Sequence, residues 1–233
     1  MHFNVYISFA CFLLISLPSS YFFTKLTSAF VPMKENKKLF IPILIALACI
    51  NNVVIFNQDI VNITWAFIGY FIILWIAFEG SLFQKLSTVL ILYPFVACFN
   101  YLLDSFSLLD FFLGPIYSQY TYNIIHAGLI TLFWYIMYSL FYKKVNHARY
   151  YLNLKARLIL SAISISPLIG ISYIIITVPS SEQLITLPIL LIILLTNIGV
   201  LYLTSYMAQY SKTLLENESL QREKVYCLTM YEV

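Results

Sequence analysis

Apolar residues in this chain form long runs that are separated by short polar stretches. Each run has the length of a helix that crosses the roughly 30 Å hydrocarbon core of a bilayer at about 1.5 Å per residue. The runs lack the period-two alternation of membrane β-strands, so we predict an all-α fold. We expect seven transmembrane spans, at residues 3–23, 39–56, 60–78, 86–103, 122–142, 158–178 and 184–207.

The positions of the 13 Lys and Arg residues support these spans and orient them. The basic residues lie in four inter-span or terminal stretches that alternate with stretches holding no base, which an even number of spans would not allow. Basic residues near span ends are retained in the cytoplasm, which predicts an outer N-terminus and an inner C-terminus. The four stretches hold Lys25, Lys34, Lys37 and Lys38; Lys85; Lys143, Lys144, Arg149, Lys155 and Arg157; and Lys212, Arg222 and Lys224.

Composition agrees with a multi-pass membrane protein. Hydrophobic residues make up 61% of the chain and charged residues 10%, which leaves too little polar surface for a soluble globule. The first span has no basic segment before it and no small-x-small cleavage site after it, so we interpret it as a mature helix. The inner basic clusters are expected to face anionic lipid headgroups rather than a nucleic acid.

Catalytic and metal-binding motifs are not found. The sequence holds no H-E-x-x-H, G-x-x-x-x-G-K-[ST] or G-x-S-x-G pattern, and its three histidines lie far apart, so we expect no catalysis, metal or cofactor in this chain. Three of the four cysteines lie in spans and one in the tail, so no disulfide is expected. The span interiors hold no charged residue, which disfavours ion-coupled transport but leaves a neutral-solute permease open.

Polar residues of the outer halves of the spans suggest a ligand pocket. Hydrogen bonds between helices, worth roughly 0.5–2 kcal/mol each, also explain them and are the simpler interpretation, and the pocket remains the alternative. The outer segment 104–121 is too apolar for a solvated loop and forms either an interfacial aromatic belt or a wall of that pocket. Four acids and no base on this side favour a neutral or cationic ligand. The candidate pocket residues are Asn52, Asp59, Asp104, Asp110, Phe112, Tyr117, Asn123 and His126.

The tail after the last span contains no Gly or Pro and predicts a helix that continues span seven into the cytoplasm. Its heptad rows are interrupted by polar residues, so a stable long coiled coil is not expected. A marginal contact between two tails would suit a signalling stem, and a solvated tail without a partner is the alternative. The candidate stem contacts are Leu214, Leu228 and Tyr231.

The stem also carries a family resemblance. Residues 215–226 follow the pattern L-E-N-E-x-L-Q-x-E-K-x-Y, and the sequence LTMYE follows at 228–232. With the hydrophobic spans before it, this segment resembles the membrane half of bacterial sensor histidine kinases of the accessory-gene-regulator type, which are quorum-sensing receptors for peptide pheromones. The resemblance implies a two-component receptor, with a sensor domain at 1–208 and a dimerising stem at 209–233.

The same resemblance implies a homodimer whose stem leads into a GHKL-type kinase domain and, through it, to a response regulator. The chain carries no phosphoacceptor or ATP-binding motif, and His147, in the sequence KKVNHARYY, does not match the phosphoacceptor context. No catalytic residue is therefore assigned. A small neutral-solute permease and a membrane scaffold remain the alternative functions.

Overall fold

The computed structural model of the chain describes residues 2–35, 37–56, 58–105, 119–146, 148–178 and 183–231. These residues form helices and one isolated β-bridge, between Met33 and Phe78, so the all-α prediction is confirmed. The helices are α1 (His2–Ser28), α2 (Lys37–Asn51), α3 (Ile60–Ala77), α4 (Leu82–Ser105), α6 (Gln119–Val145), α7 (Ala148–Tyr151), α8 (Leu154–Thr177) and α9 (Gln183–Tyr231).

Six of these helices are long and apolar enough to cross a membrane: α1, α3, α4, α6, α8 and α9. The chain therefore has the build of a multi-pass membrane protein. The structure differs from the predicted second span, 39–56, because helix α2 has 15 residues and ends at Asn51. It is roughly 22 Å long at 1.5 Å per residue, and the chain continues to Phe56 without helical structure. The prediction of a helix through residue 56 was wrong.

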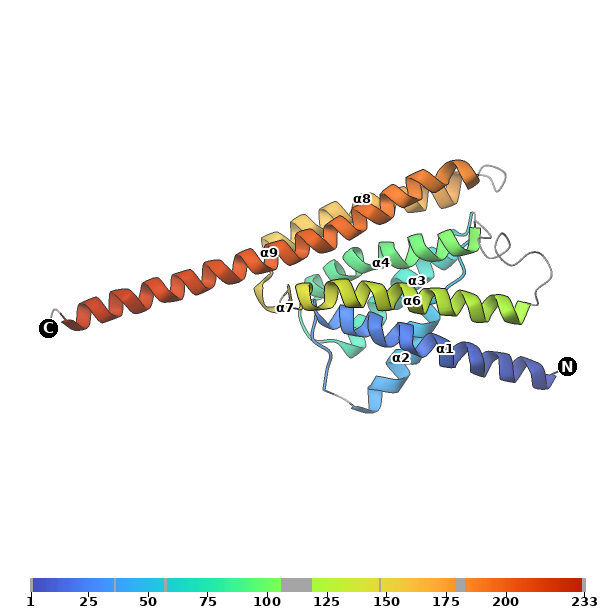
Figure 1. Cartoon of the computed structure of the whole chain (residues 1–233), viewed down its shortest axis with the longest axis horizontal. Helices are drawn as coiled ribbons and strands as arrows, with labels where there is room; N and C mark the ends of the chain where they lie inside the picture. Colours follow the sequence, from blue (N-terminus) through green and yellow to red (C-terminus); the bar gives the residue numbers. More distant parts are fainter. Residues whose placement is uncertain are drawn as a thin grey trace.

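The loops gather at two opposite ends of the helix bundle. At one end, backbone hydrogen bonds join three connections: Lys34 N donates to Ala77 O at 2.9 Å, Glu79 N to Pro32 O at 2.8 Å and Arg149 N to Ala29 O at 3.0 Å. We call this the basic end. The other end contains the α2–α3 connection, the C-terminus of α4 and the N-terminus of α6, and we call it the acidic end. Figure 1 shows the N-terminus at the acidic end and α9 projecting far beyond the basic end.

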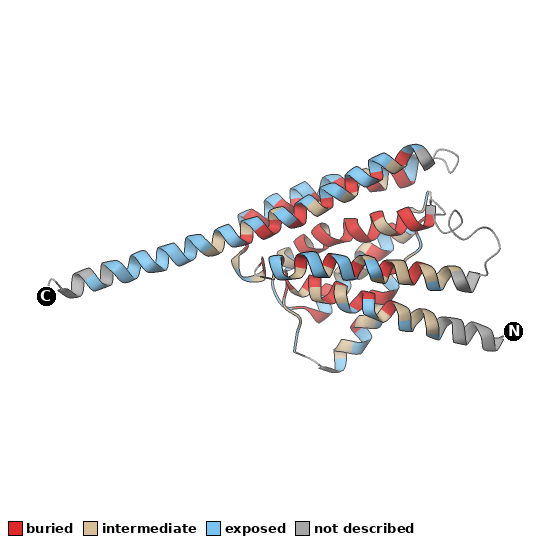
Figure 2. Cartoon of the chain, viewed as in Figure 1, coloured by how far each residue is buried: buried red, intermediate tan, exposed pale blue. Residues whose placement is uncertain are grey.

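Helix α4 forms the centre of the bundle. It packs against α3, α6, α8 and α9, and 83% of its membrane-length segment is buried, against 28–39% in the other five long helices (Figure 2). Its first turn is fixed by a capping box, in which Ser81 N donates to Gln84 Oε1 at 3.0 Å and Gln84 N donates to Ser81 Oγ at 3.3 Å. Side chains that contact α4 therefore lie in the core, whereas the outer helices have exposed apolar faces suited to lipid.

Helix α1 packs along α6 and α2 on one flank of the bundle. Phe23 and Trp134 place their ring centroids 4.5 Å apart, and Thr131 Oγ1 donates to Ile15 O at 2.8 Å. The opposite flank consists of α8 and α9, which pack against each other and against α4.

Helix α9 is one continuous helix of 49 residues, roughly 74 Å long, as the lack of Gly and Pro in the tail predicted. Its first half packs against α4, α6, α7 and α8. From Thr213 to Lys224 every residue is exposed (Figure 2), including the predicted stem contact Leu214. Leu228 and Tyr231 belong to α9, but their side chains lie outside the described part of the structure.

Candidate functional site

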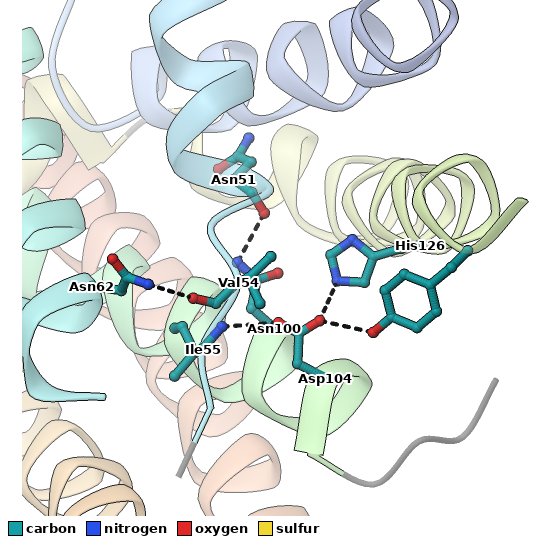
Figure 3. A network of polar contacts seen from close by, with 8 residues as sticks. Asn51, Val54, Ile55, Asn62, Asn100, Asp104 and His126 are labelled. Carbon is teal, nitrogen blue, oxygen red and sulfur yellow. Dashed lines mark hydrogen bonds and ion pairs between the residues drawn. The ribbon is translucent and has the colours of Figure 1, made fainter. Parts of the chain in front are cut away.

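The break after α2 leaves backbone groups inside an apolar bundle that need polar partners, because the helical bonding ends with Val53 N, which donates to Ile50 O at 3.3 Å. Side chains from α3 and α4 meet this requirement (Figure 3). Asn100 Nδ2 donates to Asn51 O at 2.9 Å, Ile55 N donates to Asp104 Oδ2 at 2.9 Å, and Asn62 Nδ2 donates to Val54 O at 3.0 Å. Non-helical backbone is tolerated at membrane depth where such partners are supplied.

Asp104 is the centre of this arrangement. Its side chain is buried in the last turn of α4, where the negative end of the helix dipole disfavours a carboxylate. Three contacts offset this: the Ile55 N–H, the Tyr122 hydroxyl at 3.1 Å from Oδ1 and the His126 ring nitrogen Nε2 at 3.0 Å from Oδ1. The carboxylate therefore ties α4 to the α2–α3 connection and to α6 (Figure 3).

His126 is buried and its ring stacks on Tyr122, one turn earlier on α6, with 5.8 Å between centroids. Its Nε2 lies 3.0 Å from Asp104 Oδ1 without the alignment of a hydrogen bond, so the contact is an electrostatic pairing.

Two neighbouring asparagines carry hydrogen-bonding capacity that the protein does not use. Asn51 is fully buried, and neither its Oδ1 nor its Nδ2 has a partner. Asn52 Nδ2 donates to Ala48 O at 2.8 Å, whereas its Oδ1 has no partner. Each unused buried polar group costs roughly 1–3 kcal/mol, so these amides favour an internal water or a polar ligand group. We call Asn51, Asn52, Asn100, Asp104, Tyr122 and His126 the Asp104 cluster.

The structure brings some of the predicted pocket residues together. Asp104 and His126 are in contact, Asn52 lies at the end of α2 beside Asn51, and Asn123 is half-buried on α6 three residues before His126. Asp59 has a structural role as the N-cap of α3, where Oδ1 accepts from Asn62 N at 3.0 Å and Oδ2 from Asn62 Nδ2 at 2.7 Å. The other three candidates, Asp110, Phe112 and Tyr117, lie outside the described residues.

Three members of the cluster were not among the predicted pocket residues: Asn51, Asn100 and Tyr122. One sequence signal pointed to two of them, Asn100 and Tyr122. Asn100 lies four residues before Asp104 and Tyr122 four residues before His126, so each pair shares a helical face. The partner of Asn100 is a backbone carbonyl 49 residues away, which no local pattern indicates.

The Asp104 cluster can bind by hydrogen bonding and charge rather than by covalent chemistry. It offers amide donors and acceptors, a phenol, an imidazole and one carboxylate. Within the described residues, no group of three or more His, Cys, Asp or Glu side chains could hold a metal ion. The arrangement suits a ligand with polar or cationic groups that approaches from the acidic end.

Comparisons of the chain with protein-family models, with curated proteins and with solved structures found no match. The resemblance to accessory-gene-regulator-type sensors therefore remains a prediction that depends on the stem sequence and the order of the spans.

Proposed function

We propose that this chain is the membrane receptor module of a two-component sensor histidine kinase in a bacterial cell membrane. In this proposal the chain crosses the membrane seven times, with α2 and residues 52–56 forming the second crossing. The acidic end faces the medium and senses a small peptide or a similar apolar ligand. The basic end faces the cytoplasm, because its connections carry the inward-directing Lys and Arg residues.

The observation that carries this proposal is the continuity of α9. One helix begins at the acidic end, crosses the bundle and leaves it as an exposed stem. A shift or rotation of its buried half is therefore transmitted to the stem without an intervening hinge. A second copy of the stem is the partner that we propose for its exposed Leu214, with a homodimer passing the signal to a kinase domain.

Contacts connect the Asp104 cluster to α9 through neighbouring elements. Gln58 N donates to Ile175 O at 2.6 Å, which ties the α2–α3 connection to the last turn of α8. Cys98 Sγ of α4 contacts Leu190 O of α9 at 3.6 Å. A ligand that displaces this connection would therefore act on α4 and α8, two of the helices that pack against α9.

One buried polar side chain of α9 makes no hydrogen bond inside the bundle. Asn197 is buried, and neither its Oδ1 nor its Nδ2 has a partner. The neighbouring α8 buries Ser161, whose Oγ is also without a partner. A packing of α9 in which these groups found partners would regain the roughly 1–3 kcal/mol that each unused group costs, and a second packing of this kind is what a signalling helix requires.

A chimera tests the proposal. Residues 1–233 are fused to a reporter kinase in a host that makes no related signal, and the cells are exposed to peptides secreted by related bacteria. We expect a response that disappears with Asp104→Asn and persists with Asp59→Asn, because Asp59 only caps α3. Removal of residues 209–233 should abolish the response and leave peptide binding intact. Failure of every peptide to elicit a response, together with solute flux through proteoliposomes of the shortened chain, would favour a permease instead.

A further inference from the structure

Arg157 is the most deeply buried cation among the described residues, at 2% exposure near the start of α8. Its guanidinium contacts only backbone carbonyls: Nε donates to Leu152 O, and Nη2 donates to Phe30 O and Ala148 O, each at 3.3 Å. Its Nη1 is buried without any partner. The positive charge is thus held by dipoles and is not neutralised.

A second arginine lies beside it. Two of the three carbonyls that bind Arg157 belong to Phe30 and Ala148. Arg149 follows Ala148 in the chain, and its backbone N–H donates to the carbonyl of Ala29, which precedes Phe30. The guanidinium of Arg149 stacks on the Tyr150 ring, 4.4 Å from its centroid, and its Nε is buried without a partner. Two arginines with unused N–H groups therefore occupy one small region of the basic end.

Lys144, at the C-terminal end of α6, adds a third cation next to α9. Its Nζ lies 4.7 Å from the centroid of the Tyr202 ring, and its carbonyl accepts a hydrogen bond from Ser205 Oγ at 3.1 Å. Lys144 itself is exposed and Arg149 is half-buried, so both can reach a ligand. We call Lys144, Arg149 and Arg157 the basic junction.

Among the described residues, no acidic side chain forms an ion pair with the basic junction. The ion pairs of the described residues are His126–Asp104, Lys212–Glu216 and Arg222–Glu218, and none of them involves the junction. A buried charge without a partner is strongly destabilising, so this geometry favours an external anion. The end of an apolar bundle lies at the depth of lipid headgroups, where phosphate is abundant and where arginine forms strong charge-assisted hydrogen bonds with it.

We infer that the basic junction is a binding site for the phosphate group of an anionic phospholipid. Arg149 and Lys144 contact the phosphate oxygens, and the buried Arg157 adds positive potential behind them. Because Tyr202 and Ser205 belong to α9, the lipid is bound where this helix leaves the bundle. The inference holds whether or not the chain is a receptor, since it depends only on the basic end lying in a headgroup layer.

The test uses the purified full chain in neutral detergent, with thermal unfolding followed after addition of phosphatidylglycerol, phosphatidylcholine or inorganic phosphate. We expect phosphatidylglycerol alone to raise the unfolding temperature, because a ligand that binds the folded state stabilises it. Arg149→Gln and Lys144→Gln should each weaken the apparent affinity roughly tenfold, as expected for the loss of one charge-assisted contact. Lys34→Gln removes the same charge at the same end, outside the junction, and should leave the affinity unchanged.

Three results would overturn the inference. Equal stabilisation by inorganic phosphate would indicate a site for a soluble anion, and an equal loss in Lys34→Gln would indicate diffuse charge attraction without a site. The third is an unchanged affinity for phosphatidylglycerol in both Arg149→Gln and Lys144→Gln. Native mass spectrometry of the unmodified chain provides a readout that does not depend on the folding of a variant, and it should show retained phosphatidylglycerol in preference to phosphatidylcholine.

Discussion

The two ends of the bundle each bury a charged side chain, but they treat it differently. Asp104 at the acidic end is 6% exposed and receives two hydrogen-bond donors and a histidine from other parts of the chain. Arg157 at the basic end is 2% exposed and contacts only carbonyl oxygens, at 3.3 Å. The acidic end thus supplies its buried carboxylate with donors from the chain itself, whereas the basic end has a surplus of charge that only its surroundings can balance.

Replacing Asp104 should have the largest effect on stability. Asp104→Ala leaves the buried Ile55 N–H and the half-buried Tyr122 hydroxyl without this acceptor and His126 without the facing carboxylate, and we expect a loss of about 4 kcal/mol in the free energy of unfolding. Asp104→Asn keeps one acceptor and should lose about half as much. Unfolding of both variants in detergent measures this. If Asp104→Ala lowered the free energy of unfolding by less than the substitution of an exposed surface residue does, the acidic end would not be organised by this carboxylate.

Replacing Arg157 should have a smaller effect, although the residue is more deeply buried. Arg157→Met removes three long hydrogen bonds but also removes the cost of burying an unneutralised charge, so we expect a net loss of about 2 kcal/mol. The same unfolding measurement, made without anionic lipid, provides the value. If Arg157→Met were more damaging than Asp104→Ala, the contrast between the two ends would be wrong.

The pairing within the acidic end can be isolated by a double-mutant cycle. The variants Asp104→Asn and His126→Gln, alone and together, should give a coupling free energy of about 1.5 kcal/mol, because the two groups lie 3.0 Å apart in a buried site. The matched cycle of Asp59→Asn with His126→Gln should give no coupling, since Asp59 binds Asn62 instead.

Asn197 is a third test position, in the half of α9 that packs inside the bundle. Its amide is buried without partners, so Asn197→Leu should stabilise the present packing by about 1 kcal/mol in unfolding measurements. In the chimera described above, the same variant should weaken the response, because it favours one packing of α9. Destabilisation by Asn197→Leu would show instead that the amide has a partner, such as an internal water.

Much of the fold follows from hydropathy, and its largest error has a clear physical origin. Residues 53–56 are as apolar as the helix before them, so hydropathy extended the second span through Phe56. The helix ends at Asn51 because Asn100 and Asp104 of α4 supply the hydrogen bonds that the backbone would otherwise make with itself. Partners 49 residues apart cannot be inferred from the local pattern.

The candidate site was predicted as a set of residue types but not as contacts. Asp104 and His126 were both chosen because they lie at the outer ends of apolar runs, yet nothing in the sequence showed that they touch. Arg157 was assigned to a loop because charged residues usually mark span ends. It lies inside α8 and is buried, since carbonyls from residues 5, 9 and 127 positions away converge on it.

The short helix α2 has a consequence for the membrane around it. At roughly 22 Å it is several ångströms shorter than a bilayer core, and its residues Ile41 and Ile45 face outward. In the proposed second crossing, residues 52–56 cover the remaining depth without helical structure, so the break at Asn52 lies below the headgroups of one leaflet. A thinner bilayer would bring water and headgroups closer to this break, so bilayer thickness should influence occupancy of the Asp104 cluster.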